Sequence, residues 1–223
     1  MADYGLKIKN INSEIQIDSV NRNYVFSEGA DGQAIGASGG INNHNLTNPT
    51  PYPPIVMFRP VAAGTISPAT NRLGLLTLTY SAPNYTAFQT IGLANATYDY
   101  RVFTIKDTRL GTDDYGLRIK NASGNLVYDS GFKTFRIINV ISTSNGSTVA
   151  HGATNPYYII TPTHSGILGG HPAYTFRLVQ GIHKVDSSNF YINLFLGGRI
   201  GGPTIGGSVS GTSISVVVCE YDD

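Results

Sequence analysis

The chain of 223 residues is long enough for one large β domain or two small ones, and it can bury a core without disulfide or metal support. Only 13 % of its residues are charged, about half the share in a typical soluble domain, and its net charge is +1. This balance argues against a nucleic-acid binder, and no apolar run in the sequence is long enough to span a bilayer.

The low charge also bears on how the surface is used. Charged surface residues oppose self-association, and this chain has few of them. We therefore expect much of the surface to contact other protein copies. The alternative is a loop-rich β protein that stays soluble through its many hydroxyl and amide groups. The first residues lack the apolar run of a secretory signal, and the single cysteine, Cys219, is expected in the core.

A segment near the start of the chain recurs in its second half at a constant offset. Residues 3–19 read DYGLKIKNINSEIQIDS, and residues 114–130 read DYGLRIKNASGNLVYDS. Agreement of this kind within one chain points to one structural unit used twice. The positions that define this repeat are Tyr4, Gly5, Leu6 and Asp18 in the first copy and Tyr115, Gly116, Leu117 and Asp129 in the second.

Each copy of the repeat is predicted to be a β-hairpin. Alternating runs at 6–9 and 14–18, and at 117–120 and 125–129, flank turns that contain Asn with Ser or Gly. Because Asp18 and Asp129 recur at the end of both hairpins, we expect a structural role for them, such as accepting backbone N–H bonds in an Asx-turn. A catalytic residue would be expected in one half only.

The rest of the chain predicts strands and no helix, because no window shows helical apolar spacing without Gly or Pro. Residues 27–48 are predicted as a flexible loop, or as an arm that orders on a neighbouring subunit. Residues 55–59 form a predicted strand whose flanking prolines place it at a sheet edge or end. Further strands are predicted at 73–80, 98–105, 134–141, 157–161, 174–180, 189–196 and 214–221, and a second Gly-rich loop at 197–211.

These elements predict an all-β fold of two β-sandwich-like units, residues 1–110 and 111–223, related by the internal repeat. The correspondence extends beyond the hairpins, since PYPPIVMFRPVAAG in the first half resembles NPYYIITPTHSG in the second. We expect the two hairpins to build the two cores. The alternative is a single sandwich in which the hairpins occupy equivalent places.

Few residue patterns point to catalysis or metal binding. No G-x-S-x-G elbow and no phosphate-binding P-loop occur, and only three glutamates are present. Serine is abundant, so a Ser/His/Asp triad assembled only in space stays open. The histidines have no metal-ligand spacing, although three lie in Gly-flanked turns that could converge: the five are His44, His151, His164, His171 and His183. We expect no catalytic residue, no metal and no cofactor.

Tyrosine is the enriched aromatic residue, with fourteen copies against no tryptophan. Tyrosines within strand runs are expected to pack in the core or at an interface. Four others lie beside Pro or Asn in turn-like segments and could be exposed, with packing in the core or at an interface as the alternative: Tyr52, Tyr85, Tyr157 and Tyr158. Exposed tyrosines stack on sugar rings or anchor protein interfaces, so these four are candidate contacts for a glycan or a partner protein.

Three segments of the chain together form a longer pattern. Residues 5–23 carry GL-x-I-x-N … I-D-S … R-N, residues 54–60 carry P-x-V-x-x-R-P, and residues 98–103 carry Y-x-Y-x-V-F ahead of the second repeat copy. This combination resembles small virion structural proteins of tailed bacteriophages, over roughly the first 140 residues. The resemblance implies a virion component of the tail and transfers no catalytic residues.

The leading hypothesis is a non-enzymatic structural protein of the tail tip, baseplate or fibre, made in the host cytoplasm and located in the virion. It would assemble with other virion proteins and with itself, as a trimer, through the loops at 27–48 and 197–211. The alternatives are a receptor-binding, lectin-like module that holds a host cell-surface glycan, a capsid decoration protein and, more remotely, a glycan depolymerase. Contact with nucleic acid and insertion into a membrane are not expected.

Overall fold

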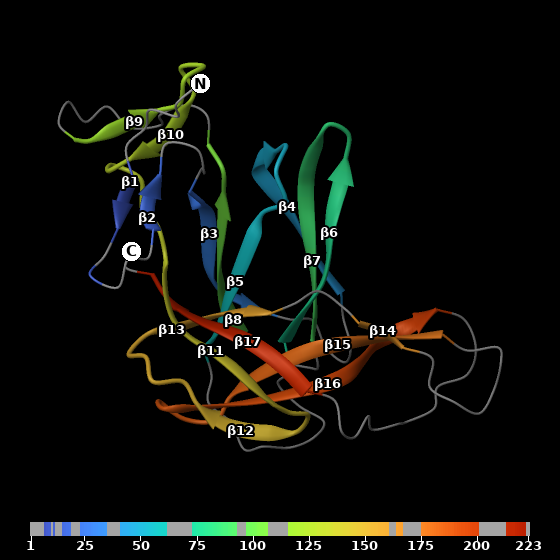
Figure 1. Cartoon of the computed structure of the whole chain (residues 1–223). Helices are drawn as coiled ribbons and strands as arrows, with labels where there is room; N and C mark the ends of the chain where they lie inside the picture. Colours follow the sequence, from blue (N-terminus) through green and yellow to red (C-terminus); the bar gives the residue numbers. More distant parts are fainter. Residues whose placement is uncertain are drawn as a thin grey trace.

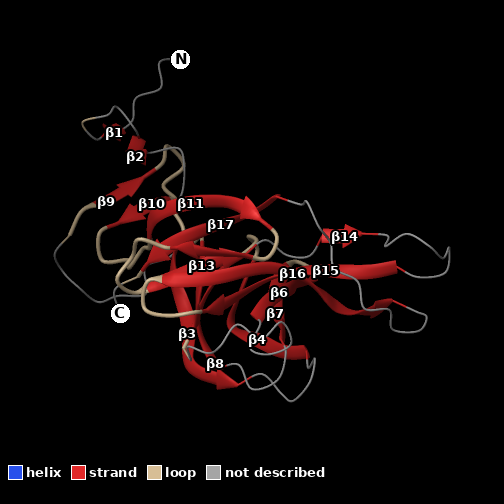
Figure 2. Cartoon of the chain, turned by 90° about the horizontal axis from the view of Figure 1, so that it is seen from below, coloured by secondary structure: helices blue, strands red, loops and turns tan. Residues whose placement is uncertain are grey.

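The structure, a computed structural model, describes residues 7–9, 11, 15–18, 23–34, 41–61, 73–92, 97–106, 116–160, 164–166, 175–200 and 213–221. These residues form strands and connecting turns and contain no helix, as predicted (Figure 2). The strands are β1 (Lys7–Lys9), β2 (Ile15–Asp18), β3 (Val25–Ala34), β4 (Ile41–Thr50), β5 (Ile55–Pro60), β6 (Leu73–Ser81), β7 (Asn84–Gly92), β8 (Thr97–Thr104), β9 (Arg118–Lys120), β10 (Leu126–Asp129), β11 (Arg136–Ser144), β12 (Ser147–Ala150), β13 (Pro156–Ile160), β14 (His164–Gly166), β15 (Thr175–Lys184), β16 (Asn189–Ile200) and β17 (Ser213–Glu220).

Two antiparallel sheets of six strands pack against each other (Figure 1). The first sheet has the order β11-β17-β13-β5-β8-β3. The second has the order β12-β16-β15-β6-β7-β4, and β14 pairs in addition with β15. The predicted all-β, sandwich-like architecture is therefore confirmed at this level.

Both halves of the chain contribute three neighbouring strands to each sheet. In the first sheet β3-β8-β5 meets β13-β17-β11, and in the second β4-β7-β6 meets β15-β16-β12. The strand pairs in each half are nested. In the first half β3 pairs with β8 and β4 with β7, and in the second half β11 pairs with β17 and β12 with β16. This nested order is also found in jelly rolls. The halves join where Phe58 pairs with Tyr158 and where Gly74 pairs with Gly181.

One apolar cluster fills the space between the sheets and draws on both halves of the chain. Alternate residues of each strand face inwards, as the pleat requires. The cluster is centred on Val56, Phe58, Tyr98, Val102, Leu73, Leu75, Phe88, Tyr158, Ile160, Ile182, Phe190, Ile192, Val216 and Val218. A second cluster lies on the other face of the first sheet and includes Met57, Phe103, Tyr157, Tyr221 and the fully buried Cys219, which confirms the prediction for the cysteine.

The two copies of the repeat form the predicted hairpins, β1 with β2 and β9 with β10. In the second hairpin the Asn121 side-chain oxygen accepts the backbone N–H of Asn125 at 2.9 Å, and Gly124 adopts a φ of 81° that favours glycine. Each hairpin is a separate two-stranded sheet, and both lie side by side at one end of the molecule (Figures 1 and 2). For the second hairpin, the expectation that the hairpins build the cores is wrong, because none of its residues belongs to the buried clusters; the side chains of β1 and β2 in the first hairpin lie outside the described part.

The predicted loop at residues 27–48 is also wrong, because most of it belongs to β3 and β4. β3 pairs with β8 and β4 with β7, and the Glu28 carboxylate bridges the two sheets by accepting the backbone N–H groups of Thr47 at 2.9 Å and Asn48 at 3.3 Å. The partner strands supply the hydrogen bonds, so tertiary pairing overrides the low strand propensity of Gly and Asn. Residues 35–40 lie outside the described part.

The position predicted for β5 is wrong as well. β5 lies between β13 and β8 in the middle of its sheet, not at an edge or end. Its flanking prolines limit its length instead, since its pairing with β13 is confined to Met57 and Phe58. In the second predicted loop, at 197–211, the first residues belong to β16, which runs to Ile200, and residues 201–211 are not described.

Candidate functional site

Two of the four tyrosines predicted as surface contacts are buried. Tyr157 is 0 % exposed and Tyr158 is 3 % exposed, because both faces of β13 are covered. The Arg59 guanidinium carbon lies 4.7 Å from the centre of the Tyr157 ring, and Phe190 packs against Tyr158 with a ring separation of 4.9 Å. The prediction that these two side chains lie on the surface is corrected, since their context is a central strand and not a turn.

The other two, Tyr52 and Tyr85, are half-buried. The Tyr85 ring lies 5.1 Å from that of Tyr80, at the turn between β6 and β7, and Tyr80 is 57 % exposed. The sequence analysis placed Tyr80 within a strand and so missed it as a surface aromatic. The Ser-Ala-Pro-Asn sequence that follows it marks a strand end, and this was the available signal.

The repeat residues that the structure describes have structural roles. Asp129 is buried, and its Oδ1 accepts the Gly131 N–H at 2.8 Å in an Asx-turn, as predicted. Gly116 has a φ of +151°, and a Cβ there would lie 2.6 Å from Ser130 Oγ, which itself accepts the Leu117 N–H at 2.9 Å. Leu117 is 46 % exposed. Only the backbone of Asp18 is described, in β2, and Tyr4, Gly5, Leu6 and Tyr115 lie outside the described residues.

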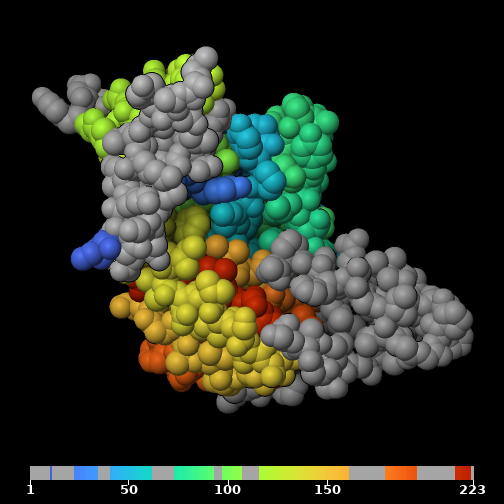
Figure 3. Space-filling model, viewed as in Figure 1, coloured from blue at the N-terminus to red at the C-terminus, as the bar shows by residue number. Residues whose placement is uncertain are grey.

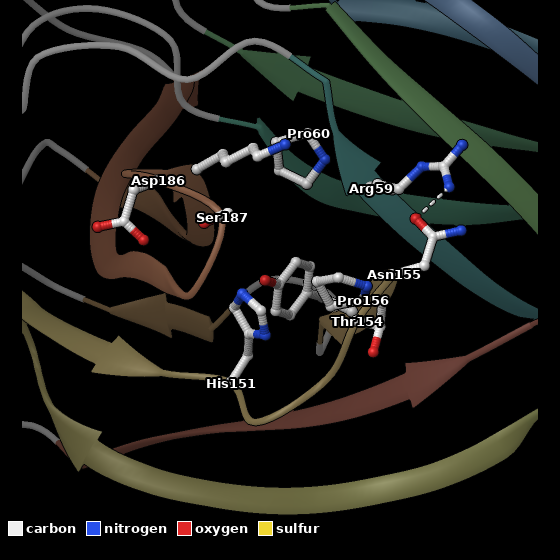
Figure 4. Close-up of a pocket in the computed structure, with 10 residues that line it drawn as sticks. Arg59, Pro60, His151, Thr154, Asn155, Pro156, Asp186 and Ser187 are labelled. Carbon is white, nitrogen blue, oxygen red and sulfur yellow. Dashed lines mark hydrogen bonds between the residues drawn. The ribbon is translucent and has the colours of Figure 1, made fainter.

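A small pocket lies where the two halves of the chain meet (Figure 4). Three segments form its walls: the end of β5, the loop between β12 and β13, and the turn between β15 and β16. Its volume is ≈ 100 Å³. The lining residues are Arg59, Pro60, His151, Thr154, Asn155, Pro156, Tyr158, Lys184, Asp186 and Ser187. Of these residues the sequence singled out only Tyr158, as a surface contact, and His151, as a histidine in a Gly-flanked turn. Arg59 and Pro60 of the first half join the other residues only when the halves associate.

The pocket walls are held by hydrogen bonds of their own. The Arg59 guanidinium donates from Nε at 2.8 Å and from Nη2 at 2.6 Å to Asp99, and from Nη1 at 2.6 Å to Asn155 (Figure 4). The Asp186 carboxylate accepts the Asn189 side-chain amide at 2.9 Å and the backbone N–H groups of Ser188 at 2.7 Å and Asn189 at 2.8 Å, and these bonds, the side-chain bond first, lower its pKa. Both charged groups are thereby fixed in place.

The strand β11, at one end of the first sheet, is exposed to an unusual degree for an apolar strand. Ile137 is 57 % exposed and Val140 is 61 % exposed, while Ile138 and Ile141 pack against the core. One edge of β11 pairs with β17, and no strand in the described part pairs with the other edge. Figure 3 shows the yellow residues of β11 and β12 at the molecular surface.

Other site types are not found in the described residues. No three His, Cys, Asp or Glu side chains there lie close enough together to hold a metal ion. No helix in the described part has the length and apolarity to cross a membrane. Comparison of the chain with models of protein families, with curated proteins and with solved structures gives no match.

Proposed function

We propose that the chain is a non-enzymatic structural component of a tailed-phage virion, in the tail tip, baseplate or fibre, which assembles with copies of itself and with other virion proteins. The sequence resemblance supports the virion assignment. The observation that carries the assembly role is the strand β11, whose open edge and exposed Ile137 and Val140 suit pairing with another chain.

The four strands at the ends of the two sheets differ in how well they resist such pairing. β3 contains register shifts and the charged Glu28, β4 contains Pro49 and a register shift, and β12 has only four residues. β11 has nine residues and no proline; it carries one register shift, between Ile137 and Asn139, and one charge, Arg136, which forms an ion pair with Glu220. Bulges, charges, prolines and short length are the usual protections of an edge strand. Of the four strands, β11 combines a length of nine residues with the absence of proline and with two exposed apolar side chains, Ile137 and Val140.

We also propose that the two halves are copies of one six-stranded unit. The supporting observations are the strand order, which both halves share, and the repeated hairpin, which lies near the start of each half. In this view the chain contains two units, residues 1–110 and 111–223, that pair edge to edge through β5 with β13 and β6 with β15.

Assembly through β11 is tested by the substitution Val140→Lys. We expect the wild-type protein to sediment as an oligomer of the 23.8 kDa chain, and the Lys variant to sediment as a monomer because the charge opposes edge pairing. Thr79→Lys is the control for an added charge, since Thr79 is exposed on β6, in the other sheet, where it pairs with Ala87 of β7. Circular dichroism of both variants checks that the fold is kept.

The mass of the oligomer identifies the geometry. Pairing of β11 with a different edge of the next copy closes a ring, and we propose a trimer of this kind. Pairing of β11 with itself gives a two-fold dimer. A wild-type chain that stays monomeric at high concentration contradicts the proposal. Cryo-electron microscopy of the intact particle then separates a tail position from the capsid position of a decoration protein.

A further inference from the structure

Two largely buried residues, His151 and Tyr158, line the pocket between the two halves and have hydrogen-bond donors without a partner among the described residues. His151 is 3 % exposed, its backbone N–H donates to the Ser188 carbonyl at 3.1 Å, and its Nδ1 accepts the Ala153 N–H at 3.1 Å. An accepting Nδ1 carries no proton, so the proton of the neutral ring is on Nε2. Nε2 donates to no group that the structure describes, which leaves this N–H for a ligand.

Tyr158 adds a second donor to the same pocket. Its side chain is 3 % exposed and lines the pocket, and its ring centre lies 6.4 Å from that of His151. The hydroxyl has no hydrogen-bond partner in the described part of the chain. Burial raises the pKa of Tyr158, so the hydroxyl keeps its proton at neutral pH and acts as a donor. Both donors are therefore available to water or to a ligand in the pocket.

The charges around the pocket favour an anion. Lys184 lines it, and its ammonium forms no ion pair with any described residue. The positive charge of Arg59 is offset by Asp99. Asp186 is the one carboxylate among the lining residues. Its charge interacts with His151, but it is exposed and bonded within its own turn, and Figure 4 shows it directed away from Arg59 and Asn155. The groups available to a ligand are therefore donors, and one of them carries a full positive charge.

We propose that this pocket binds a single oxyanion group, a carboxylate or a phosphate, through Lys184, the Nε2–H of His151 and the hydroxyl of Tyr158. The volume of ≈ 100 Å³ exceeds that of one water but is well below the roughly 300 Å³ of a pocket for a drug-sized ligand. It therefore suits one oxyanion group, either free or at the end of a larger molecule such as an acidic sugar. Pro60 and Pro156 supply apolar walls beside that group. This inference does not depend on the proposed function.

Titration calorimetry of the full-length protein tests the proposal, with inorganic phosphate and glucuronate as probes and glucose as the neutral counterpart of glucuronate. We expect at least one of the two anions to bind with a Kd on the order of 1 mM and glucose not to bind. Binding of phosphate alone identifies a phosphate group as the ligand, and binding of glucuronate alone identifies a carboxylate. Either result supports the site.

Two variants assign the binding to this pocket. Lys184→Gln removes the charge and Tyr158→Phe removes only the hydroxyl, and each is expected to weaken anion binding about tenfold. Lys120→Gln is the control, because Lys120 is exposed on β9, outside the pocket. The proposal is overturned if neither anion binds at concentrations on the order of 10 mM, if glucose binds as tightly as glucuronate, or if Lys184→Gln leaves the Kd unchanged.

Discussion

At the scale of single residues, His44 is a half-buried side chain whose pKa depends on burial. Its Nε2 lies 2.7 Å from the Tyr98 hydroxyl and 3.2 Å from that of Thr90, and its ring stacks on Phe88 with a centre separation of 4.6 Å. Burial lowers the pKa of His44 below its ordinary value of 6.5, because the low-dielectric surroundings disfavour the charged ring. The neutral form is thus the one that the fold accommodates.

This lowered pKa makes stability depend on pH in a defined direction. As the pH falls below 6.5, the unfolded chain binds a proton at His44 before the folded chain does. The contribution of His44 is therefore complete above that pH and is lost as the pH falls towards the folded-state pKa. Since the side chain is partly exposed, we expect a loss of less than about 1 kcal/mol.

The measurement is urea unfolding at about pH 7.5 and about pH 5.5, for the wild type and His44→Gln. Other groups titrate equally in both proteins, so the difference between the two pH dependences isolates His44. The same decrease in both proteins would show that His44 does not sense this pH range.

At the scale of elements, the carboxylate of Asp99 ties three strands of the first sheet together. Asp99 is 4 % exposed on β8; its Oδ2 accepts from Arg59 on β5, and its Oδ1 accepts the Gly32 N–H of β3 at 2.8 Å. A buried carboxylate is stable only when it is paired and hydrogen-bonded, and here both oxygens are. The pair also orients Arg59 beside the pocket.

The substitution Asp99→Asn is expected to destabilise the protein by about 2–3 kcal/mol, because it leaves a partly buried guanidinium without its counter-charge. Asn155→Ala removes the exposed contact to the same guanidinium and should cost less than about 1 kcal/mol. Chemical unfolding of both variants gives the two free energies. If the two variants lost similar free energies of unfolding, burial of the Arg59–Asp99 pair would contribute little to the stability of the protein.

At the scale of the whole molecule, the two halves share one core. Phe58 and Val56 from the first half and Tyr158 and Ile160 from the second belong to the same buried cluster. Separation of the halves would expose this apolar surface and the unpaired edges of β5 and β13.

We therefore expect residues 111–223 produced alone to be unfolded or aggregated, and co-expression with residues 1–110 to restore a soluble complex. Circular dichroism and size-exclusion chromatography distinguish the outcomes. A fragment that folds alone with cooperative unfolding would show that each half is stable by itself and that the shared cluster adds little.

The sequence alone was sufficient for the local features. Alternating apolar residues and Asn- or Gly-containing turns predict both hairpins, the role of Asp129 and most of the strands correctly, because these features depend on neighbouring residues. The burial of Cys219 follows in the same way from the apolar run around it.

Tertiary structure alone decided the features that depend on partners distant in the chain. Residues 27–34 and 41–48 form strands because β8 and β7 pair with them. β5 is central because β13 from the other half adds to its edge, and Tyr157 and Tyr158 are buried for the same reason. The pocket is complete only when Arg59 of the first half meets His151 and Lys184 of the second. Hydrogen-bond partners and burial are properties of the assembled sheets, and local sequence patterns do not encode which strand lies next to which.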